Sequence, residues 1–212
     1  VFHLAAQALV RKSYISPIET YHSNTIGTLN ILESLRVLKK KCAVVLITSD
    51  KVYKNIETNK GYKENDVLGG KDPYSGSKVA AENIIASYLN SFFDGKKSKI
   101  LICVARAGNV IGGGDWSSDR IIPDCVKSWS KNKIPKIRNP NSTRPWQHVL
   151  EAVGGYLVLG SNLFRNKKFH GQSFNFGPLS KKNYKVIDLL KSLQLNWKDK
   201  KWRINKKNQN LF

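Results

Sequence analysis

Short apolar runs alternate with helical repeats along most of the chain. The runs 42–48 (CAVVLIT) and 99–107 (KILICVARA) are mostly apolar and rich in β-branched residues, which is typical of strands covered on both faces. Residues 1–6 (VFHLAA) are predicted to be the end of a strand followed by a loop, and residues 173–177 (SFNFG) are a further candidate strand. Apolar residues at helical spacing predict helices over 17–41, 72–93, 119–132, 148–163 and 186–193. This order predicts the α/β class, with a parallel sheet that carries helices on both faces.

The predicted strand 42–48 ends abruptly in polar residues. Its last apolar positions are followed by Thr48, Ser49, Asp50 and Lys51. In open parallel sheets, ligands bind at the carboxyl ends of the strands. The sequence therefore predicts a candidate site at this edge of the sheet, which also receives the loop after the strand 99–107.

Tyr74 and Lys78 are four residues apart in the predicted helix 72–93, so they share one helix face. A tyrosine phenol has a pKa of about 10, which is too high for a base at neutral pH. A neighbouring ammonium favours the phenolate, which can then take a proton from a sugar hydroxyl. Taken alone, the pair is better explained as two solvent-facing neighbours, since this spacing also arises by chance.

Composition limits the other functional classes. The 212 residues carry a formal net charge of +21, mostly from lysines spread along the chain, and this permits either a nucleic-acid surface or a composition bias with solvated basic faces. The absence of a nucleic-acid motif favours the composition bias. There is no apolar run of membrane-spanning length and no signal peptide. The cysteines Cys42, Cys103 and Cys125 are expected to be thiols in a reducing, cytoplasmic setting. His3, His22 and His170 lack metal-ligand spacing, so no metal site is assigned.

Seven motifs then occur in a fixed order. They are HLAAQ (3–7), NTIGTLNILE (24–33), TSDKVY (48–53), YSGSK (74–78), ARAGNVIGGGDW (105–116), DRIIPD (119–124) and RPWQHVLE (144–151). Together they resemble the extended short-chain dehydrogenase/reductase family, and within it the nucleotide-sugar 4,6-dehydratases, over residues 1 to 180. The family's GxxGxxG dinucleotide turn does not occur in the sequence. We therefore expect the sequence to be part of a longer chain and to be inactive by itself.

The resemblance implies a partial Rossmann domain over residues 1–110, which binds NAD. Residues 111–212 are then mostly a smaller lobe that binds the sugar nucleotide, with returning segments that pack on the Rossmann domain. The implied reaction removes hydride from C4 of the hexose, eliminates water across C5 and C6, and returns the hydride to C6. The cofactor is thereby recycled and stays bound.

The resemblance also implies the role of each catalytic residue. Tyr74 is the base for the 4-hydroxyl, and Lys78 lowers the pKa of that phenol and holds the nicotinamide ribose. Ser49 hydrogen-bonds the 4-oxygen. Asp50 protonates the departing 6-hydroxyl, and Lys51 is the base for the C5 proton, acting directly or through water. The alternative for Asp50 and Lys51 is a surface ion pair at the end of a strand.

Further positions match the family's binding residues. Leu4, Ala5, Ala6 and Gln7 are expected to line the nicotinamide half of NAD, and Asn24 to contact it. Asn24 has the alternative, or additional, role of a helix N-cap. The residues that match the grip on the nucleotide diphosphate are Asn109, Arg120 and Arg144, with Arg138 as a weaker candidate.

Lys51 decides the expected substrate. It stands where the enzymes that act on dTDP-glucose carry a glutamate, and this departure is shared with the type that acts on CDP-glucose. We therefore expect CDP-glucose as substrate, in the synthesis of deoxysugars for O-antigen and lipopolysaccharide. Alternatives are another nucleotide-sugar 4,6-dehydratase or a 4-epimerase of the same family and, more remotely, a basic nucleic-acid-binding module. The full-length protein is expected to be a homodimer without a membrane or nucleic-acid partner.

Overall fold

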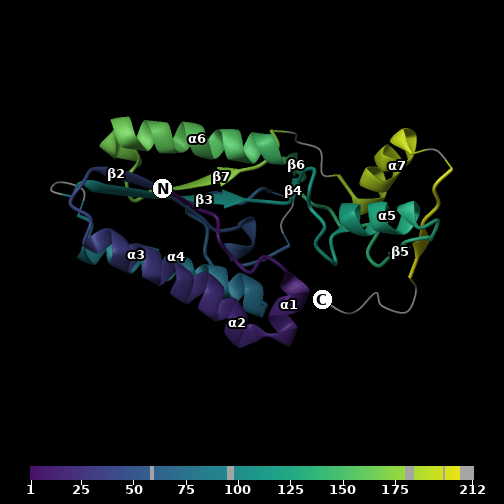
Figure 1. Ribbon diagram of the computed structural model, residues 1–212, viewed down its shortest axis with the longest axis horizontal. Helices are drawn as coiled ribbons and strands as arrows, with labels where there is room; N and C mark the ends of the chain where they lie inside the picture. Colours follow the sequence, from purple (N-terminus) through teal and green to yellow (C-terminus); the bar gives the residue numbers. More distant parts are fainter. Residues whose placement is uncertain (58–59, 95–97, 180–183, 198, 206–212) are drawn as a thin grey trace. The chain divides into compact units, whose positions relative to one another are not determined.

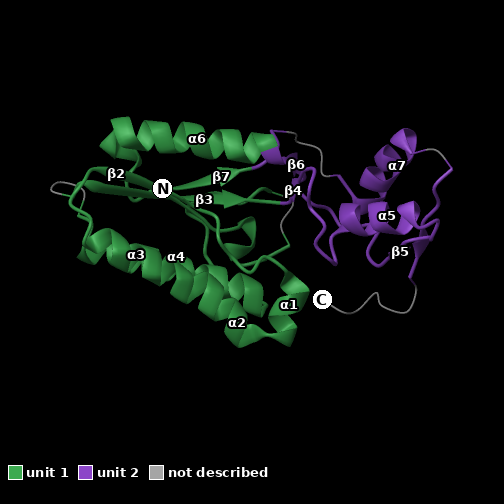
Figure 2. Cartoon of the chain, in the orientation of Figure 1, with its two compact units in different colours: residues 1–108, 150–176 green, residues 109–149, 177–212 purple. Residues whose placement is uncertain are grey.

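The structure is a computed structural model that describes residues 1–57, 60–94, 98–179, 184–197 and 199–205 (Figure 1). The chain divides into two compact units (Figure 2). Unit 1 comprises residues 1–108 and 150–176, and unit 2 comprises residues 109–149 and 177–212. The assignment of these units to NAD and to the sugar nucleotide stays a prediction.

A four-stranded parallel sheet forms the centre of unit 1. Its strands are β1 (Phe2–His3), β2 (Cys42–Ile47), β3 (Ile100–Ala107) and β7 (Ser173–Phe176), in the order β1-β2-β3-β7. All eight residues of β3 are buried, as its mostly apolar run predicts. The strand end predicted within residues 1–6 is β1, and the chain leaves the sheet after His3, as the predicted loop requires.

Helices cover both faces of this sheet, which confirms the predicted α/β class (Figure 1). On one face lie α3 (Gly27–Arg36) and α4 (Pro73–Ser91), and on the other lies α6 (Val149–Arg165). The largest buried cluster joins the sheet to α3 and α4. Its members are Leu32, Leu35, Val44, Leu46, Ile85, Phe93, Ile100, Ile102 and Val104.

The predicted helix over 17–41 is interrupted by a different helical geometry. It consists of α2 (Pro17–Tyr21), a π-helical turn η1 (His22–Ile26) and α3. The π turn spans only five residues, which is too short for a change in periodicity to register, and such turns are frequent at functional sites. The sequence also did not predict α1 (Val10–Ile15), because six residues are too few for a helical repeat to register.

Unit 2 is built on two helices and two pairs of short parallel strands. The helices are α5 (Ile121–Ser130) and α7 (Val186–Asn196). The strand pairs are β4 (Val110–Ile111) with β6 (Gln147–His148), and β5 (Lys136–Ile137) with β8 (Arg203–Ile204). Its buried core contains Cys125, Trp129, Ile137 and Leu190. The helix predicted from 119 begins at Ile121 because Asp119 adopts the left-handed conformation, with a φ of 63°.

Short 3₁₀ turns complete the described elements, η2 (Asp50–Val52) after β2 and η3 (Lys167–Phe169) after α6. Of the polar tail beyond Asn196, for which no element was predicted, residues 198 and 206–212 lie outside the described ranges. Within those ranges, no helix combines the length and apolarity needed to cross a membrane.

Two adjacent glycines of α6 provide a test of how closely this helix packs on the sheet. A Cβ at Gly155 would collide with the ring of Phe176, 2.7 Å from its Cδ1, whereas a Cβ at Gly154 would meet open space. Both substitutions gain the same helix propensity, about 0.5–1 kcal/mol. We therefore expect Gly155→Ala to be less stable than Gly154→Ala by about 1–3 kcal/mol, the cost of overpacking. Urea unfolding of the two variants measures this difference, and equal free energies of unfolding would contradict the close packing.

Candidate active site

The end of β2 turns directly into the 3₁₀ turn η2. Ser49 is buried and caps this turn, since its Oγ accepts a hydrogen bond from the Lys51 amide at 3.2 Å. The same hydroxyl donates to Oδ1 of Asp50 at 3.1 Å. Asp50 is half-buried and Lys51 is exposed. The turn therefore presents a hydroxyl, a carboxylate and an ammonium at the carboxyl edge of the sheet.

The first turn of α4 is fixed by a reciprocal capping box. The Ser75 amide donates to Oδ1 of Asp72 at 3.0 Å, and the Asp72 amide donates to Oγ of Ser75 at 3.1 Å. Tyr74 lies inside this turn and is buried. Lys78 follows one turn later, and its ammonium donates to the backbone carbonyl of Ile47 at 3.4 Å. The helix thus brings Tyr74 and Lys78 to the end of β2.

Burial makes Lys78 an unusual lysine. Only 6% of the residue is exposed. Desolvation of the ammonium lowers the pKa of Lys78 to about 8, and the nearby carboxylate of Glu82 offsets part of this effect. His3, at the end of β1, has its pKa lowered as well, first by burial and then by the charge of Lys78.

The turn after β2 and the helix face come together at Tyr74. The ammonium of Lys51 lies 5.7 Å from the centre of the Tyr74 ring. Tyr74 therefore has Lys78 one helical turn away and Lys51 over its ring. The acid–amine doublet and the Tyr–Lys pair, which come from separate motifs, lie in one place on unit 1.

The loop after β1 is joined to α4 through Asn24. The Gln7 amide donates to Oδ1 of Asn24 at 2.8 Å, and Nδ2 of Asn24 donates to the Gln7 carbonyl at 3.0 Å and to Oγ of Ser77 at 2.9 Å. Asn24 lies within the π turn and caps no helix, so the N-cap alternative is wrong. Before Gln7, the small residues of the loop (Leu4, Ala5, Ala6) are exposed.

The four positions that match the diphosphate grip all lie in unit 2. Arg120 pairs with Asp115 at 3.1 Å, and Arg138 pairs with Asp119 at 3.5 Å. Arg144 is exposed, and Asn109 is half-buried at the start of the strand pair β4–β6.

Sequence reasoning missed two buried charges in unit 1. Glu82 and Arg106 form an ion pair in which the side chains are only 5% and 4% exposed. Both could have been noticed. Glu82 extends the four-residue spacing of Tyr74 and Lys78 by one more turn, and Arg106 is a charge within an otherwise apolar strand, where a buried charge requires a partner.

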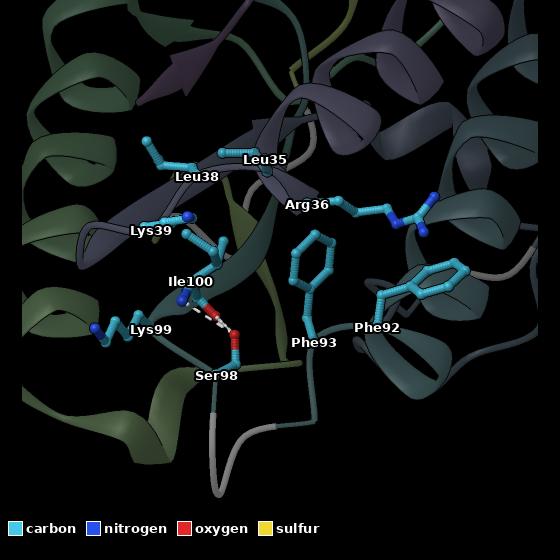
Figure 3. A pocket seen from close by; sticks show the side chains of 9 residues that line it. All are labelled: Leu35, Arg36, Leu38, Lys39, Phe92, Phe93, Ser98, Lys99 and Ile100. Carbon is cyan, nitrogen blue, oxygen red and sulfur yellow. Dashed lines mark hydrogen bonds between the residues drawn. The ribbon is translucent and has the colours of Figure 1, made fainter.

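A surface pocket of about 540 Å³ lies elsewhere on unit 1 (Figure 3). It is lined by residues at the ends of α3 and α4 and at the start of β3, which are Leu35, Arg36, Leu38, Lys39, Phe92, Phe93, Ser98, Lys99 and Ile100. Since β3 begins here, the pocket is at the amino edge of the sheet. It contains none of the candidate catalytic residues.

The fold and the motifs define a Rossmann-type protein of the extended short-chain dehydrogenase/reductase class. The chain belongs to the family described as GDP-mannose 4,6 dehydratase, whose model matches residues 1–208. It is 46% identical over 202 residues to a CDP-glucose 4,6-dehydratase from Salmonella typhimurium, covering 94% of this chain and 56% of that protein.

Solved structures agree on the fold. A UDP-glucuronic acid 4-epimerase from Bacillus cereus, in complex with UDP-glucuronic acid and NAD, matches with a TM-score of 0.81 and 22% identity, over 96% of this chain and 61% of that one. A dTDP-glucose 4,6-dehydratase from Streptomyces venezuelae with NAD bound matches with a TM-score of 0.78 and 20% identity, over 97% and 61% of the two chains. This chain thus spans a little over half the length of these proteins.

Lys78→Met tests the burial of the ammonium through stability. The folded pKa of Lys78, about 8, is below its ordinary value of 10.5, so the folded state carries the full penalty of a buried charge below pH 8. We expect the variant to be more stable than the parent by about 1–3 kcal/mol at pH 7. This advantage shrinks as pH rises from 8 to 10.5, because the folded parent loses its proton first. Urea unfolding at several pH values measures it, with the exposed Lys71→Met as control; a pH-independent difference would contradict the pKa.

Gly70→Ala tests the placement of Tyr74. A Cβ at Gly70 would collide with the backbone of Ser75 and Gly76, 2.7 Å from Cα of Gly76, whereas a Cβ at Gly61 in the same loop would meet open space. Since a backbone cannot rotate away as a side chain can, we expect Gly70→Ala to lower the free energy of unfolding by about 1–3 kcal/mol. Gly61→Ala serves as the matched control. Similar free energies of unfolding for the two variants would refute the contact.

Proposed function

We propose that this chain carries the catalytic centre of an NAD-dependent nucleotide-sugar 4,6-dehydratase that converts CDP-glucose to CDP-4-dehydro-6-deoxyglucose. The observation that carries the proposal is the position of Lys51 over Tyr74. A 4-epimerase requires the Tyr–Lys pair and a hydroxyl. A dehydratase requires in addition an acid and a base close to C5 and C6, and the turn Asp50–Lys51 supplies both next to Tyr74.

The residues present fit the nicotinamide half of NAD. The exposed small residues of the loop after β1 allow a cofactor to approach the backbone closely, and Asn24 holds this loop against α4. Lys78 donates one long hydrogen bond to Ile47, which leaves donor capacity on its buried ammonium for ribose hydroxyls. When bound, NAD⁺ supplies the acceptor for the hydride from C4 of the hexose and the donor that returns it to C6.

The chain's own residues then move the protons. Tyr74, as phenolate beside the Lys78 ammonium, takes the proton of the 4-hydroxyl while Ser49 hydrogen-bonds the 4-oxygen. The resulting 4-ketone acidifies the proton on C5, which Lys51 removes directly or through a water molecule. Asp50 donates a proton to the 6-hydroxyl, which leaves as water, and Lys51 returns the proton to C5 when hydride is added at C6. For the water loss, Lys51 must be neutral and Asp50 protonated when the substrate is bound.

Lys51 also supports CDP-glucose over other nucleotide sugars, as does the CDP-glucose 4,6-dehydratase that is similar to this chain. In unit 2, the guanidinium groups of Arg120 and Arg138 are paired with Asp115 and Asp119. We propose that they exchange these carboxylates for the diphosphate, since guanidinium forks bind phosphate oxygens in the same geometry. Asn109 and Arg144 complete the proposed grip.

The setting of the reaction is part of the proposal. A 4-dehydro-6-deoxy sugar nucleotide is a precursor for the deoxysugars of surface polysaccharides such as O-antigen. A reducing cytoplasm is supported by the thiols Cys42, Cys103 and Cys125, which are all free. Homodimer formation is supported by exposed apolar side chains on the helices of unit 1, among them Ile15 (83% exposed) and Ile18 (85% exposed).

The deciding experiment uses the full-length, NAD-loaded protein with CDP-, dTDP-, GDP- and UDP-sugars. Water loss from CDP-glucose, at a higher kcat/KM than from the other sugars, supports the proposal. Turnover of UDP-galactose without dehydration would show a 4-epimerase instead. A salt-sensitive complex with DNA that is unaffected by CDP-sugar would favour the nucleic-acid alternative.

Asp50→Asn separates the contribution of the proposed acid from that of the Tyr–Lys pair. We expect it to lower kcat for water loss by about 10²–10⁴-fold, the usual contribution of a general acid, while hydride removal from C4 persists. Tyr74→Phe is expected to abolish hydride removal. Product formation and the absorbance of reduced nicotinamide report the two steps separately. Asp66→Asn is the control, because Asp66 is exposed and an asparagine can still accept the hydrogen bond from the Lys63 amide. Equal loss of both steps in Asp50→Asn would argue against its role as the acid.

A further inference from the structure

One buried ion pair contacts both ends of the segment that carries Ser49, Asp50 and Lys51. The hydroxyl of Thr48, directly before this segment, donates to Oε1 of Glu82 at 2.6 Å. The phenol oxygen of Tyr53, at its other end, accepts from Nη1 of Arg106 at 2.8 Å. The guanidinium also lies 5.0 Å from the centre of the Tyr53 ring. The Glu82–Arg106 pair therefore fixes where the turn begins and where it ends.

The acid of this pair belongs to the helix face that carries the Tyr–Lys pair. Tyr74, Lys78 and Glu82 follow one another at four-residue spacing in α4, so they form one stripe. Nε of Arg106 donates to Oε1 of Glu82 at 2.8 Å, and Nη2 forms the second arm of the fork with Oε2. A buried two-point contact of this kind resists both rotation and sliding of the helix relative to β3.

The same guanidinium reaches the loop between the turn and α4. Nη1 of Arg106 donates to the carbonyl of Glu64 at 2.9 Å. Oε1 of Glu64 accepts from the Asn175 amide at 2.8 Å, and the Tyr53 hydroxyl donates to Oδ1 of Asn175 at 2.6 Å. Strand β7 and the loop are thereby joined to the same centre.

We propose that Glu82 and Arg106 are positioning residues, a clamp that holds the Asp50–Lys51 turn in register with the Tyr74–Lys78 face. The inference rests on the proposed dehydratase function and deepens it. Hydride removal from C4 depends mainly on the helix face, to which Ser49 adds one hydrogen bond, and the later water loss depends on Asp50 and Lys51 of the turn. The clamp matters because both groups must meet one hexose, and a displacement of about 1 Å can cost about 10²-fold in rate.

Arg106→Lys keeps the positive charge and removes the fork. In the full-length, NAD-loaded protein we expect kcat with CDP-glucose to fall about 10–100-fold. KM is expected to stay within about twofold, because the clamp does not touch the nucleotide grip in unit 2. Reduced nicotinamide is expected to accumulate during turnover, because hydride still leaves C4 while water loss is slowed. Loss of folded protein alone would lower kcat without raising the reduced fraction per folded molecule.

A second variant keeps the proposal testable if Arg106→Lys does not fold. Glu82→Leu combined with Arg106→Met removes both charges and so leaves neither one buried without a partner. It is expected to fold and to show the same accumulation of reduced nicotinamide. The control is Glu33→Gln, which removes the exposed pair between Glu33 and Arg36 and should leave the kinetics unchanged. Unchanged kcat without accumulation, in folded Arg106→Lys, overturns the proposal.

Hydrogen exchange tests the clamp without catalysis. We expect the amides of residues 49–53 to exchange at least about tenfold faster in Arg106→Lys, because their opening free energy falls locally. The amides of α5 in unit 2 should not change. If the parent protein dehydrates no nucleotide sugar, the proposed function fails, and the exchange data still decide whether the clamp exists. Unchanged exchange at residues 49–53 shows that it does not.

Discussion

The burial of charge in unit 1 is the constraint on which its chemistry depends. Taking an ion out of water costs several kcal/mol unless a partner and hydrogen bonds replace the solvent. Glu82 and Arg106 meet this requirement with a two-armed contact and a surrounding set of hydrogen bonds to Thr48, Tyr53 and the loop before α4. Lys78 meets it only in part, with one long hydrogen bond and a carboxylate one turn away. The fold thus contains one satisfied buried pair and one poorly satisfied buried cation.

This difference matches what each group would do. A structural contact is most effective when its partners have no other favourable arrangement, and the forked pair is of that kind. A group that binds ribose and stabilises a phenolate needs the opposite property. It must be held in place and yet keep donors for the ligand. The lowered pKa of Lys78 shows that burial of its ammonium costs the folded state free energy at the candidate site. Favourable interactions in the rest of the fold offset this cost.

The sequence predicts elements well where a long pattern has a single physical meaning. The continuous apolar run of β2, the mostly apolar run of β3 and the length of α4 are of this kind, and the structure confirms them. The two-residue strands of unit 2 carry no such pattern, because their pairing is decided by the surrounding fold. The π turn at Asn24 was not predicted because it is only five residues long, too short for its own periodicity to be recognised.

The candidate site, like the fold, was predicted from the sequence only in part. Motif matches indicated which residues to examine, and the structure then brought Lys51 to Tyr74, a proximity that no spacing in the sequence contains. Arg106 stands out as a charge within an apolar strand, but the Glu82–Arg106 pair was missed because the sequence does not show which acid is its partner. Only the sheet register, which sets Ile47 beside Ala105, brings the end of β2 and Arg106 to the same buried centre. A constellation of this type is a property of topology, so it follows from the fold and not from a local motif.

The large positive charge acquires a different meaning in this context. A net charge of +21 would suit a nucleic acid, yet two of the arginines in unit 2 are already paired with carboxylates, Arg120 with Asp115 and Arg138 with Asp119. Such pairs weaken binding to a featureless polyanion, since each phosphate contact must displace an internal partner. They are well suited to a compact diphosphate, which can replace a carboxylate within the same fork geometry. The surrounding positive field then raises the local concentration of an anionic substrate without specifying it. In the proposed function, charge would attract the sugar nucleotide, and the arrangement of a few side chains would select what is done to it.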